Sequence, residues 1–346
     1  MAAALALAAP VVAQTPTPTP RSELADPDGV LVEELIVVGR LPGPALARPP
    51  AAPRSDLPDP DGVLLEELIV VGRLPGPAWW TVSDADTTVY VLGAPSLAPK
   101  HMDWDRALFE KRLAGSSVVI LPFQDVKVRL TGVIGAAFNF LRLRGGGPFE
   151  ATLDEQTRAR FVAARTRLGE PADHYDTKNP LAAGLMLATD YRDRSGLTSS
   201  DPTKLIKLLA GRAHVPVSQK SYNIGPLMGT IIRTPQAAGR ACFDEVLAQV
   251  EAGPGVTRAA ARAWAQGDVR GALANERTYE RCVASVPGAQ AFDARVKADQ
   301  VAAIEQALKT PGHAIAVVPL RPLLAQGGVL DQLRAKGFTV KTPGEE

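Results

Sequence analysis

The chain has 346 residues, of which 46% are hydrophobic and 22% are charged, and its net charge is +1. These proportions are those of an ordinary globular protein, and the length allows one domain of roughly 200 to 270 residues with appendages. The balanced charge argues against a nucleic-acid partner. No run of eighteen or more apolar residues occurs, so the sequence predicts no membrane-spanning segment.

The first residues form a signal-like segment. Residues 1–13 are almost wholly Ala, Leu, Val and Pro, and residues 11–13 are small enough for signal peptidase to cut there. We therefore expect a periplasmic or secreted protein. The alternative is an apolar start without fixed structure, because the run lacks the basic residues that usually open a signal peptide.

A tandem duplication follows within residues 14–74, a Pro-rich leader that we expect to be disordered. Residues 20–45 read PRSELADPDGVLVEELIVVGRLPGPA, and residues 53–78 read PRSDLPDPDGVLLEELIVVGRLPGPA. The copies differ only at Glu23/Asp56, Ala25/Pro58 and Val32/Leu65. Only the second copy adjoins the globular body, so the first looks redundant.

Each copy carries a short β-prone run after two glutamates, at residues 35–38 and 68–71. This pattern is typical of the acidic-apolar box by which some exported bacterial proteins add a strand to the energy-coupling protein TonB. The alternative, which we favour, is an edge strand that folds onto its own domain.

The body alternates strand-like and helix-like segments from residue 79 onward. The first expected elements are strands at 79–83 and 88–93 joined by a turn at 84–86, a helix at 103–115 capped by Asp103, and a strand at 117–123. The helices of the middle are expected to open with a capping box at 152–155, to start at 201–202 and 234–235, and to extend over 268–286 and 291–308. The last expected elements are a strand at 314–318, a helix at 328–336 and a strand at 338–341. This order predicts an α/β fold with a helix-rich middle.

Sequence motifs lie at both ends of this body. Residues 77–104 read PAWWTVSDADTTVYVLGAPSLAPKHMDW, and residues 312–340 read GHAIAVVPLRPLLAQGGVLDQLRAKGFTV. With WAQGD at residues 264–268, these motifs resemble the TraB/GumN family of metal-dependent hydrolases. The resemblance implies a TraB/ChaN-like α/β domain over residues 75–341 with two facing sheet-and-helix halves. In active relatives, a metal between two GxxH motifs would serve a protease-like hydrolysis.

The same resemblance implies that this chain lacks the metal ligands. Ser96 and Pro322 stand where the two histidines are expected, and Pro122 replaces a glutamate at a strand end. A second glutamate position falls at Lys220 or Ser221. Proline has no side-chain donor, and a serine hydroxyl is a poor ligand at neutral pH. We therefore expect no catalytic residue, no metal and no cofactor.

Around these positions we expect a pocket lined by Gly93, Ser96, Asp103 and Arg321. The only local cluster with metal-like chemistry elsewhere is residues 173–176, which read DHYD, and we favour a solvated turn there. An apolar run at residues 132–140 could touch a membrane surface, but a buried segment is the interpretation we favour.

The two cysteines form an even set in a chain that we expect to be exported to an oxidising compartment. Cys242 and Cys282 fall in two different expected helices that could pack side by side. We predict a disulfide between them; the alternative is two buried free thiols.

Three hypotheses of function remain open. The first is an exported pseudoenzyme with a binding or scaffold role in the cell envelope and an unknown protein or peptide ligand. The second is a metal-dependent hydrolase with a rearranged site. The third is a TonB-coupled or envelope-interaction module that acts through the duplicated leader.

Overall fold

The computed structural model describes residues 55–70, 74–123, 147–199, 202–224, 227 and 229–345. The chain divides into two units, residues 1–53 and 54–346, and every described residue belongs to the second. The signal-like segment, the first copy of the duplication and the apolar run at 132–140 lie outside the described residues. No helix within the described ranges combines the length and apolarity needed to cross a membrane.

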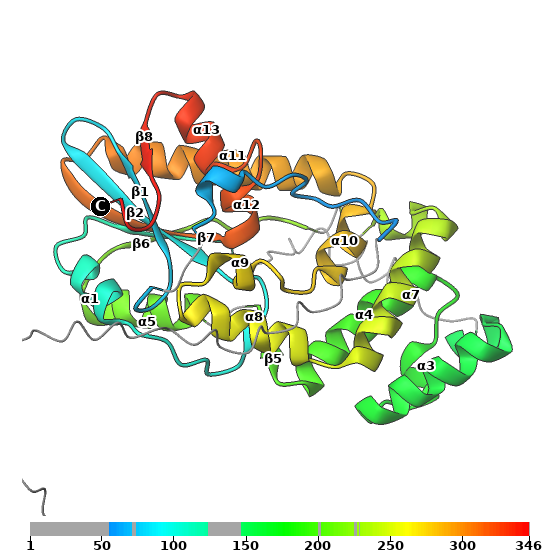
Figure 1. The fold of residues 1–346 in the computed structure, drawn as a ribbon. Coiled ribbons are helices and arrows are strands. Elements are labelled where there is room, and N and C mark those ends of the chain that lie inside the picture. The colour runs from blue at the N-terminus through cyan, green and yellow to red at the C-terminus, as the bar shows by residue number, and fades with distance from the viewer. Residues whose placement is uncertain are drawn as a thin grey trace, which may run out of the picture. The chain divides into compact units, whose positions relative to one another are not determined.

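A mixed six-stranded sheet forms the centre of the second unit, in the order β6-β4-β7-β2-β1-β8 (Figure 1). Its strands are β1 (Trp79–Ser83), β2 (Thr87–Ala94), β4 (Val119–Leu121), β6 (Val217–Gln219), β7 (Gly312–Pro319) and β8 (Thr339–Lys341). Strands β2, β7, β4 and β6 run parallel, and β1 runs antiparallel to β2 and to β8. Strands β3 (Ala98–Pro99) and β5 (Leu197–Thr198) form a separate antiparallel pair.

Helices cover both faces of the sheet. The chain moves across the sheet from β2 through α1 (Ala107–Leu113) to β4, and through α5 (Thr203–Arg212) to β6, before α11 (Ala289–Leu308) leads back to β7. Because crossovers between parallel strands are right-handed, the outward and returning helices lie on opposite faces. Figure 1 shows this arrangement, with α1 and α5 below the sheet and α11 and α13 (Val329–Ala335) above it.

The middle of the chain is helical, so the predicted α/β class with a helix-rich middle is confirmed. Its helices are α3 (Glu155–Leu168), α4 (Pro180–Arg194), α7 (Gln236–Ala252), α8 (Gly255–Ala265), α9 (Val269–Ala272) and α10 (Thr278–Ala284), and a short helix α12 (Leu320–Leu324) follows β7. Aromatic rings fill a second apolar cluster among them, with Phe149, Phe161 and Phe243 packed edge to face.

The predicted disulfide joins this helical part. Cys242 of α7 and Cys282 of α10 are bonded, with their Cα atoms 5.2 Å apart, and both side chains are fully buried. The link ties α7 to α10, whose neighbouring residues reach the cavity described below.

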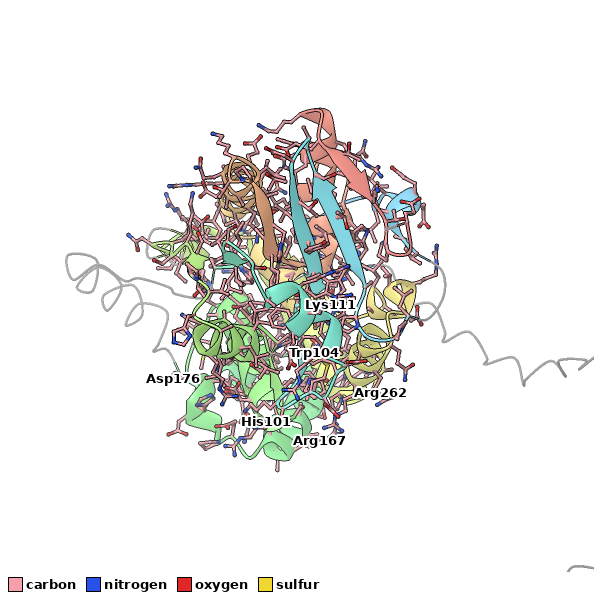
Figure 2. All side chains as sticks on the ribbon, turned by 90° about the vertical axis from the view of Figure 1, so that its left-hand side faces the viewer. His101, Trp104, Lys111, Arg167, Asp176 and Arg262 are labelled. Atoms are coloured by element: carbon pink, nitrogen blue, oxygen red, sulfur yellow. A yellow bond between two sulfur atoms is a disulfide. The ribbon has the colours of Figure 1, made fainter. Side chains whose placement is uncertain are left out.

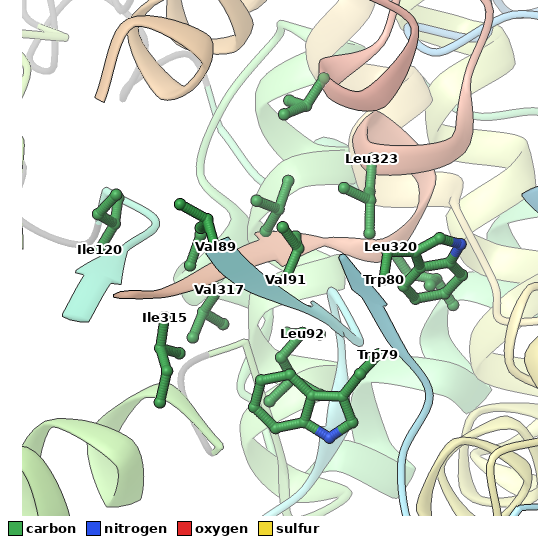
Figure 3. Packing of buried hydrophobic residues seen from close by; sticks show 14 of the residues in the cluster. Trp79, Trp80, Val89, Val91, Leu92, Ile120, Ile315, Val317, Leu320 and Leu323 are labelled. Carbon is green, nitrogen blue, oxygen red and sulfur yellow. The ribbon is translucent and has the colours of Figure 1, made fainter. Parts of the chain in front are cut away.

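The hairpin of β1 and β2 is confirmed, and it carries both adjacent tryptophans into the core (Figure 3). Trp80 lies beside Leu320 and Leu323 of α12, whereas Trp79 stacks on Phe109 of α1 with ring centroids 6.2 Å apart. Successive residues of a strand point to opposite faces. Each tryptophan therefore fills the layer on one side of the sheet.

Two expected helix starts are corrected by the structure. α1 begins at Ala107, and the carboxylate that accepts its backbone N–H (2.9 Å) belongs to Asp105, not to Asp103. α3 is capped by Asp154, which accepts from the Thr157 N–H, because Thr152 is taken up by a preceding 3₁₀ turn. Asp154 is thus a side-chain N-cap, whereas Asp105 lies one residue before the N-cap position of α1, Arg106.

The long helix expected at residues 268–286 is broken into α9 and α10. Asp268 caps the first piece, and the Leu273 carbonyl at its end accepts a hydrogen bond (2.9 Å) from Arg321. Arg277, just before α10, is turned toward two aspartates of the leader. These contacts outweigh the helical propensity of the linking residues.

The second copy of the duplication packs on the body, although the leader was expected to be disordered to residue 74. Leu57 and Leu68 are buried. A 3₁₀ turn, Glu66–Leu68, ends at the first residue of the β-prone run that was expected to make an edge strand at 68–71, and the next two residues belong to no strand. The Trp80 indole donates to the Leu68 carbonyl at 3.1 Å. The compact unit accordingly begins at Arg54.

Candidate functional site

A cavity of about 370 Å³ lies at the carboxyl ends of the parallel strands β2, β4 and β7. Residues 94–96 follow β2 into it, residues 122–123 follow β4, and residues 319–322 lead from β7 into α12. Ligands of α/β sheets bind in this position because loops from several strands converge there. The volume is within the range of small-ligand pockets.

The remaining wall comes from two helical segments and from the leader. Its apolar members are chiefly Ala272, Leu273, Val283, Ala284, Ala289, Phe292 and Val296. Its charged members are Asp61, Arg277, Glu280, Asp293, Lys297 and Arg321. The cavity is thus an apolar chamber with a few charged groups, which is the usual composition of a binding site.

The structure brings four of the sequence-predicted residues to this cavity. Ser96, Pro122, Arg321 and Pro322 all line it. They meet there because β2, β4 and β7 are neighbouring parallel strands, so their carboxyl ends fall at one edge of the sheet.

Gly93 and Asp103 are not among the lining residues. A Cβ at Gly93 would come within 2.5 Å of Leu320 Cδ1, so a glycine is needed there for close packing. The Gly93 carbonyl accepts a hydrogen bond from the Trp264 indole. Asp103 is exposed and precedes Trp104, which Figure 2 labels near Lys111 of α1.

A buried ion-pair network forms one side of the cavity. The Arg277 guanidinium pairs with both Asp59 and Asp61 of the leader. Lys297 Nζ lies 3.0 Å from Asp61 and 2.8 Å from Asp293. Only 6% of the Arg277 side chain and 10% of the Lys297 side chain are exposed, so these pairs are desolvated and removing one partner would be costly.

The pKa values follow from this network. Burial is the largest single influence on the pKa of Asp59 and would raise it. The hydrogen bonds from Arg277 and from the Asp61 N–H, together with the nearby charges of Arg277 and Arg321, outweigh burial and lower the pKa. Burial alone would lower the pKa of Lys297, but its hydrogen bonds to Asp293 and Asp61 raise it. The ionised forms of both groups are therefore stabilised by their partners.

Sequence reasoning missed Arg277 and Lys297. Arg277 falls in a segment expected to be continuous helix. Both partners of Arg277, and one of the two partners of Lys297, lie in a leader expected to be disordered. The available signal was the sequence Asp-Pro-Asp-Gly, which both copies of the duplication share.

Arg321 differs from the other two cations of the cavity. Its guanidinium donates to the Leu273 carbonyl, and no carboxylate of the described residues pairs with it. Burial, followed by the neighbouring charge of Arg277, lowers the pKa of Arg321. An anion bound in the cavity would stabilise the charged form of the Arg321 side chain against both burial and the nearby charge of Arg277.

Asn275 adds an acceptor to the same wall. Its amide nitrogen donates to the Leu97 carbonyl at 3.2 Å. Its buried side-chain oxygen has no hydrogen-bond partner in the part of the chain that the structure describes. A ligand with both a carboxylate and an N–H could satisfy Arg321 and Asn275 together.

The residues at the strand ends do not fit a metal. Pro122 and Pro322 offer no side-chain donor, and the Asp61 and Asp293 carboxylates already pair with cations. Among the described residues, no group of three or more His, Cys, Asp or Glu side chains could hold a metal ion. We therefore derive no metal-dependent step at this site.

The cluster at residues 173–176 belongs to a different part of the fold. His174 Nε2 lies 2.9 Å from an Asp190 carboxylate oxygen, to which the Tyr175 hydroxyl donates at 2.7 Å. These bonds fasten a 3₁₀ turn to α4, and Tyr175 is fully buried. The turn is thus packed on the helical part and not simply solvated.

Comparison with known proteins agrees with the motifs at the two ends of the body. The model of the TraB/PrgY/gumN family matches residues 78–342. No curated protein and no solved structure matches the chain. Since the family model covers most of the sequence, from β1 to β8, the chain belongs to the TraB/PrgY/gumN family.

Proposed function

We propose that this protein is an exported, non-catalytic member of its family that binds an acidic peptide in the strand-end cavity. The observation that carries the proposal is Arg321, a cation in a largely apolar chamber without a carboxylate partner among the described residues. Arg277 and Lys297 beside it already hold aspartates of a peptide segment, so the surroundings suit acidic side chains. Asn275 supplies an acceptor for a peptide N–H.

Loss of catalysis is the second part of the proposal. It is supported by Ser96, Pro122 and Pro322 at the positions where the resemblance implies metal ligands. A metal-dependent hydrolase with a rearranged site is the competing hypothesis. Hydrolysis of reporter peptides that requires an added transition metal would favour that hypothesis over ours.

Export is the third part. It is supported by the signal-like composition of residues 1–13 and by the disulfide, since disulfides persist in oxidising compartments. Fractionation of the producing cell should recover the protein outside the cytoplasm. Recovery of the bulk of the protein from the cytoplasm would contradict export.

The binding experiment compares, by titration calorimetry, short acidic peptides with amidated forms in which every carboxylate, on the side chains and at the C-terminus, is replaced by an amide. We expect binding of the free acids to weaken tenfold or more in Arg321→Gln, because hydrogen bonds to charged groups contribute about 1.5–3 kcal/mol. Arg160→Gln is the matched control, since Arg160 pairs on the surface with Glu251 and does not line the cavity. Equal binding of free and amidated peptides, or no effect of Arg321→Gln, would contradict the proposal.

A further inference from the structure

The second copy of the duplication occupies a defined surface of the body, which we call the leader-docking surface. It consists of the side chains of Glu245, Arg270, Arg277, Lys297 and Arg334 with the backbone of residues 324–326. The contacts extend along residues 55–69, from the Ser55 hydroxyl on Glu245 to the buried Ile69.

The contacts are specific in both charge and backbone register. Asp59 and Asp61 pair with buried Arg277, while Glu66 and Glu67 pair with Arg270 and Arg334 at 2.7 and 3.3 Å. The Leu65 N–H donates to the Leu324 carbonyl (2.9 Å), and the Gln326 N–H donates to the Val63 carbonyl (2.8 Å). Leu57 and Leu68 insert into two different apolar clusters.

The first copy keeps each side chain that makes these contacts. Offset by the length of the repeat, Ser22, Leu24, Asp26, Asp28, Glu33, Glu34, Leu35 and Ile36 match Ser55, Leu57, Asp59, Asp61, Glu66, Glu67, Leu68 and Ile69. The positions at which the copies differ carry none of them. Asp56 and Pro58 are exposed. Leu65 contributes a backbone hydrogen bond, which Val32 can also make, and its partly buried side chain packs against the main apolar cluster, where Val32 offers a smaller apolar side chain.

We propose that the first copy, residues 20–45, is a second ligand for the leader-docking surface, so that the two copies are alternative occupants within one chain. The two sequences offer the same charges and apolar side chains to the same partners. Docking of the first copy would leave residues 46–78 as a loop whose two ends meet at the start of β1.

Chain connectivity decides which copy docks. The second copy runs directly into β1, whereas docking of the first must close the loop of residues 46–78. Loop-closure entropy for a chain of this length disfavours the first copy on the order of 10²-fold. The second copy is therefore the dominant occupant, and the first docks when the second is removed or bound elsewhere.

Exchange of the copies would also replace two residues that line the cavity. Pro60 and Asp61 line it, and Pro27 and Asp28 would take their places. The cavity would keep its acidic wall, while the displaced residues 53–78 would become available to another partner. This inference does not depend on the proposed peptide ligand of Arg321.

The test uses the full chain in four forms: wild type, Asp26→Lys/Asp28→Lys, Asp59→Lys/Asp61→Lys, and the combination of all four changes. Hydrogen exchange with mass spectrometry distinguishes the copies, because peptides spanning residues 22–36 and 55–69 differ in sequence at three positions. Lysines at 59 and 61 would face Arg277 and Lys297, so the second copy should leave.

We expect amides of residues 22–36 to become protected in Asp59→Lys/Asp61→Lys, and those of residues 55–69 to lose protection. The unfolding equilibrium constant should be at least tenfold larger in the combined variant than in Asp59→Lys/Asp61→Lys. Asp26→Lys/Asp28→Lys alone should match the wild type. The proposal is wrong if residues 22–36 stay unprotected and the combined variant has the same unfolding equilibrium constant as Asp59→Lys/Asp61→Lys.

A peptide covers the case in which Asp59→Lys/Asp61→Lys does not fold well. A synthetic peptide of residues 21–39 should raise, in a saturable way, the thermal midpoint of the combined variant, in which neither copy within the chain can dock. The matched control is the same peptide with Asp26→Asn and Asp28→Asn, which should have little effect. A midpoint that responds to neither peptide at millimolar concentration would overturn the proposal.

Discussion

At the scale of single residues, the cavity combines uncharged residues at the strand ends with positively charged side chains from neighbouring segments. Ser96, Pro122 and Pro322 occupy the strand ends and give the cavity its shape. The positive charges come from Arg277, Lys297 and Arg321, and of these Arg321 has no carboxylate partner among the described residues. The site therefore suits recognition of an anion by preorganised cations.

The disulfide gives the first prediction. Replacing Cys242 and Cys282 by Ser should lower the free energy of unfolding by about 4 kcal/mol on the loop-entropy model for the closed segment between them. Denaturant unfolding in oxidising buffer measures the change, and unreduced, denatured wild-type protein should show no free thiol. The double variant is its own control, because reductant should destabilise the wild type and leave the variant unaffected. Two thiols titrating in the wild type would refute the prediction.

At the scale of elements, strands could be predicted better than helix ends. Residues 89–94 and 314–318 form continuous apolar or β-prone runs, because strands covered on both faces have little need for polar residues. The starts of α1 and α3 were displaced by three and two residues from the expected caps Asp103 and Thr152, since several nearby carboxylates and hydroxyls could serve as caps.

The candidate site was predictable only in part, for a physical reason. Ser96, Pro122, Arg321 and Pro322 follow strands, and strand order alone brings them to one edge. Arg277 could not be placed in this way, because its position depends on a helix break stabilised by contacts distant in sequence. Those contacts involve residues 55–70, whose Pro-rich, charged sequence resembles a linker.

Packing of the second copy gives a prediction with an internal control. Leu68 is fully buried in the main core, whereas Val63 in the same segment is 69% exposed. Leu68→Ala should cost about 2–5 kcal/mol of unfolding free energy, and Val63→Ala should stay within about 0.5 kcal/mol. Denaturant unfolding should be measured in a chain without residues 14–52, where the first copy cannot substitute. Similar effects of the two changes would mean that the segment does not dock.

The first copy should be dispensable when the second is intact. Deleting residues 14–52 removes the first copy and leaves the second in direct continuity with β1. We expect the thermal midpoint to change by no more than about a degree or two, because the deletion leaves every contact of the second copy with the body in place. Differential scanning calorimetry checks this expectation. A large drop would show that residues 14–52 contribute to the folded body.

At the scale of the whole molecule, the site is assembled from both ends of the folded unit. β2 comes near its beginning and β7 near its end, and the leader and α12 approach the same cavity. The family match spans the same range, from residue 78 to residue 342. A truncation at either end would therefore remove part of the cavity wall.

The residues that the structure describes offer no fitting donor set, and this predicts how the protein behaves toward metals. Dialysis against a chelator should leave the thermal midpoint unchanged, because a ligand that binds only the folded state is needed to raise it. Elemental analysis of protein purified without chelator should find zinc, manganese and cobalt well below one atom per chain. Readdition of each metal to the dialysed protein serves as the control. A stoichiometric metal whose removal lowers the midpoint by several degrees would contradict this prediction.

The parallel pairing of β2 with β7 also determines when the molecule can fold. Thr87 is in register with Gly312, and β8 closes the far side of the hairpin still later in the chain. A ribosome releases the N-terminal hairpin long before the strands that flank it have been made. Until synthesis is nearly complete, the outer edges of β1 and β2 have no partner strands. The long sequence separation between this hairpin and strands β7 and β8 makes the pairing slow. The topology thus delays burial of the core and keeps the new chain accessible to chaperones for most of its synthesis.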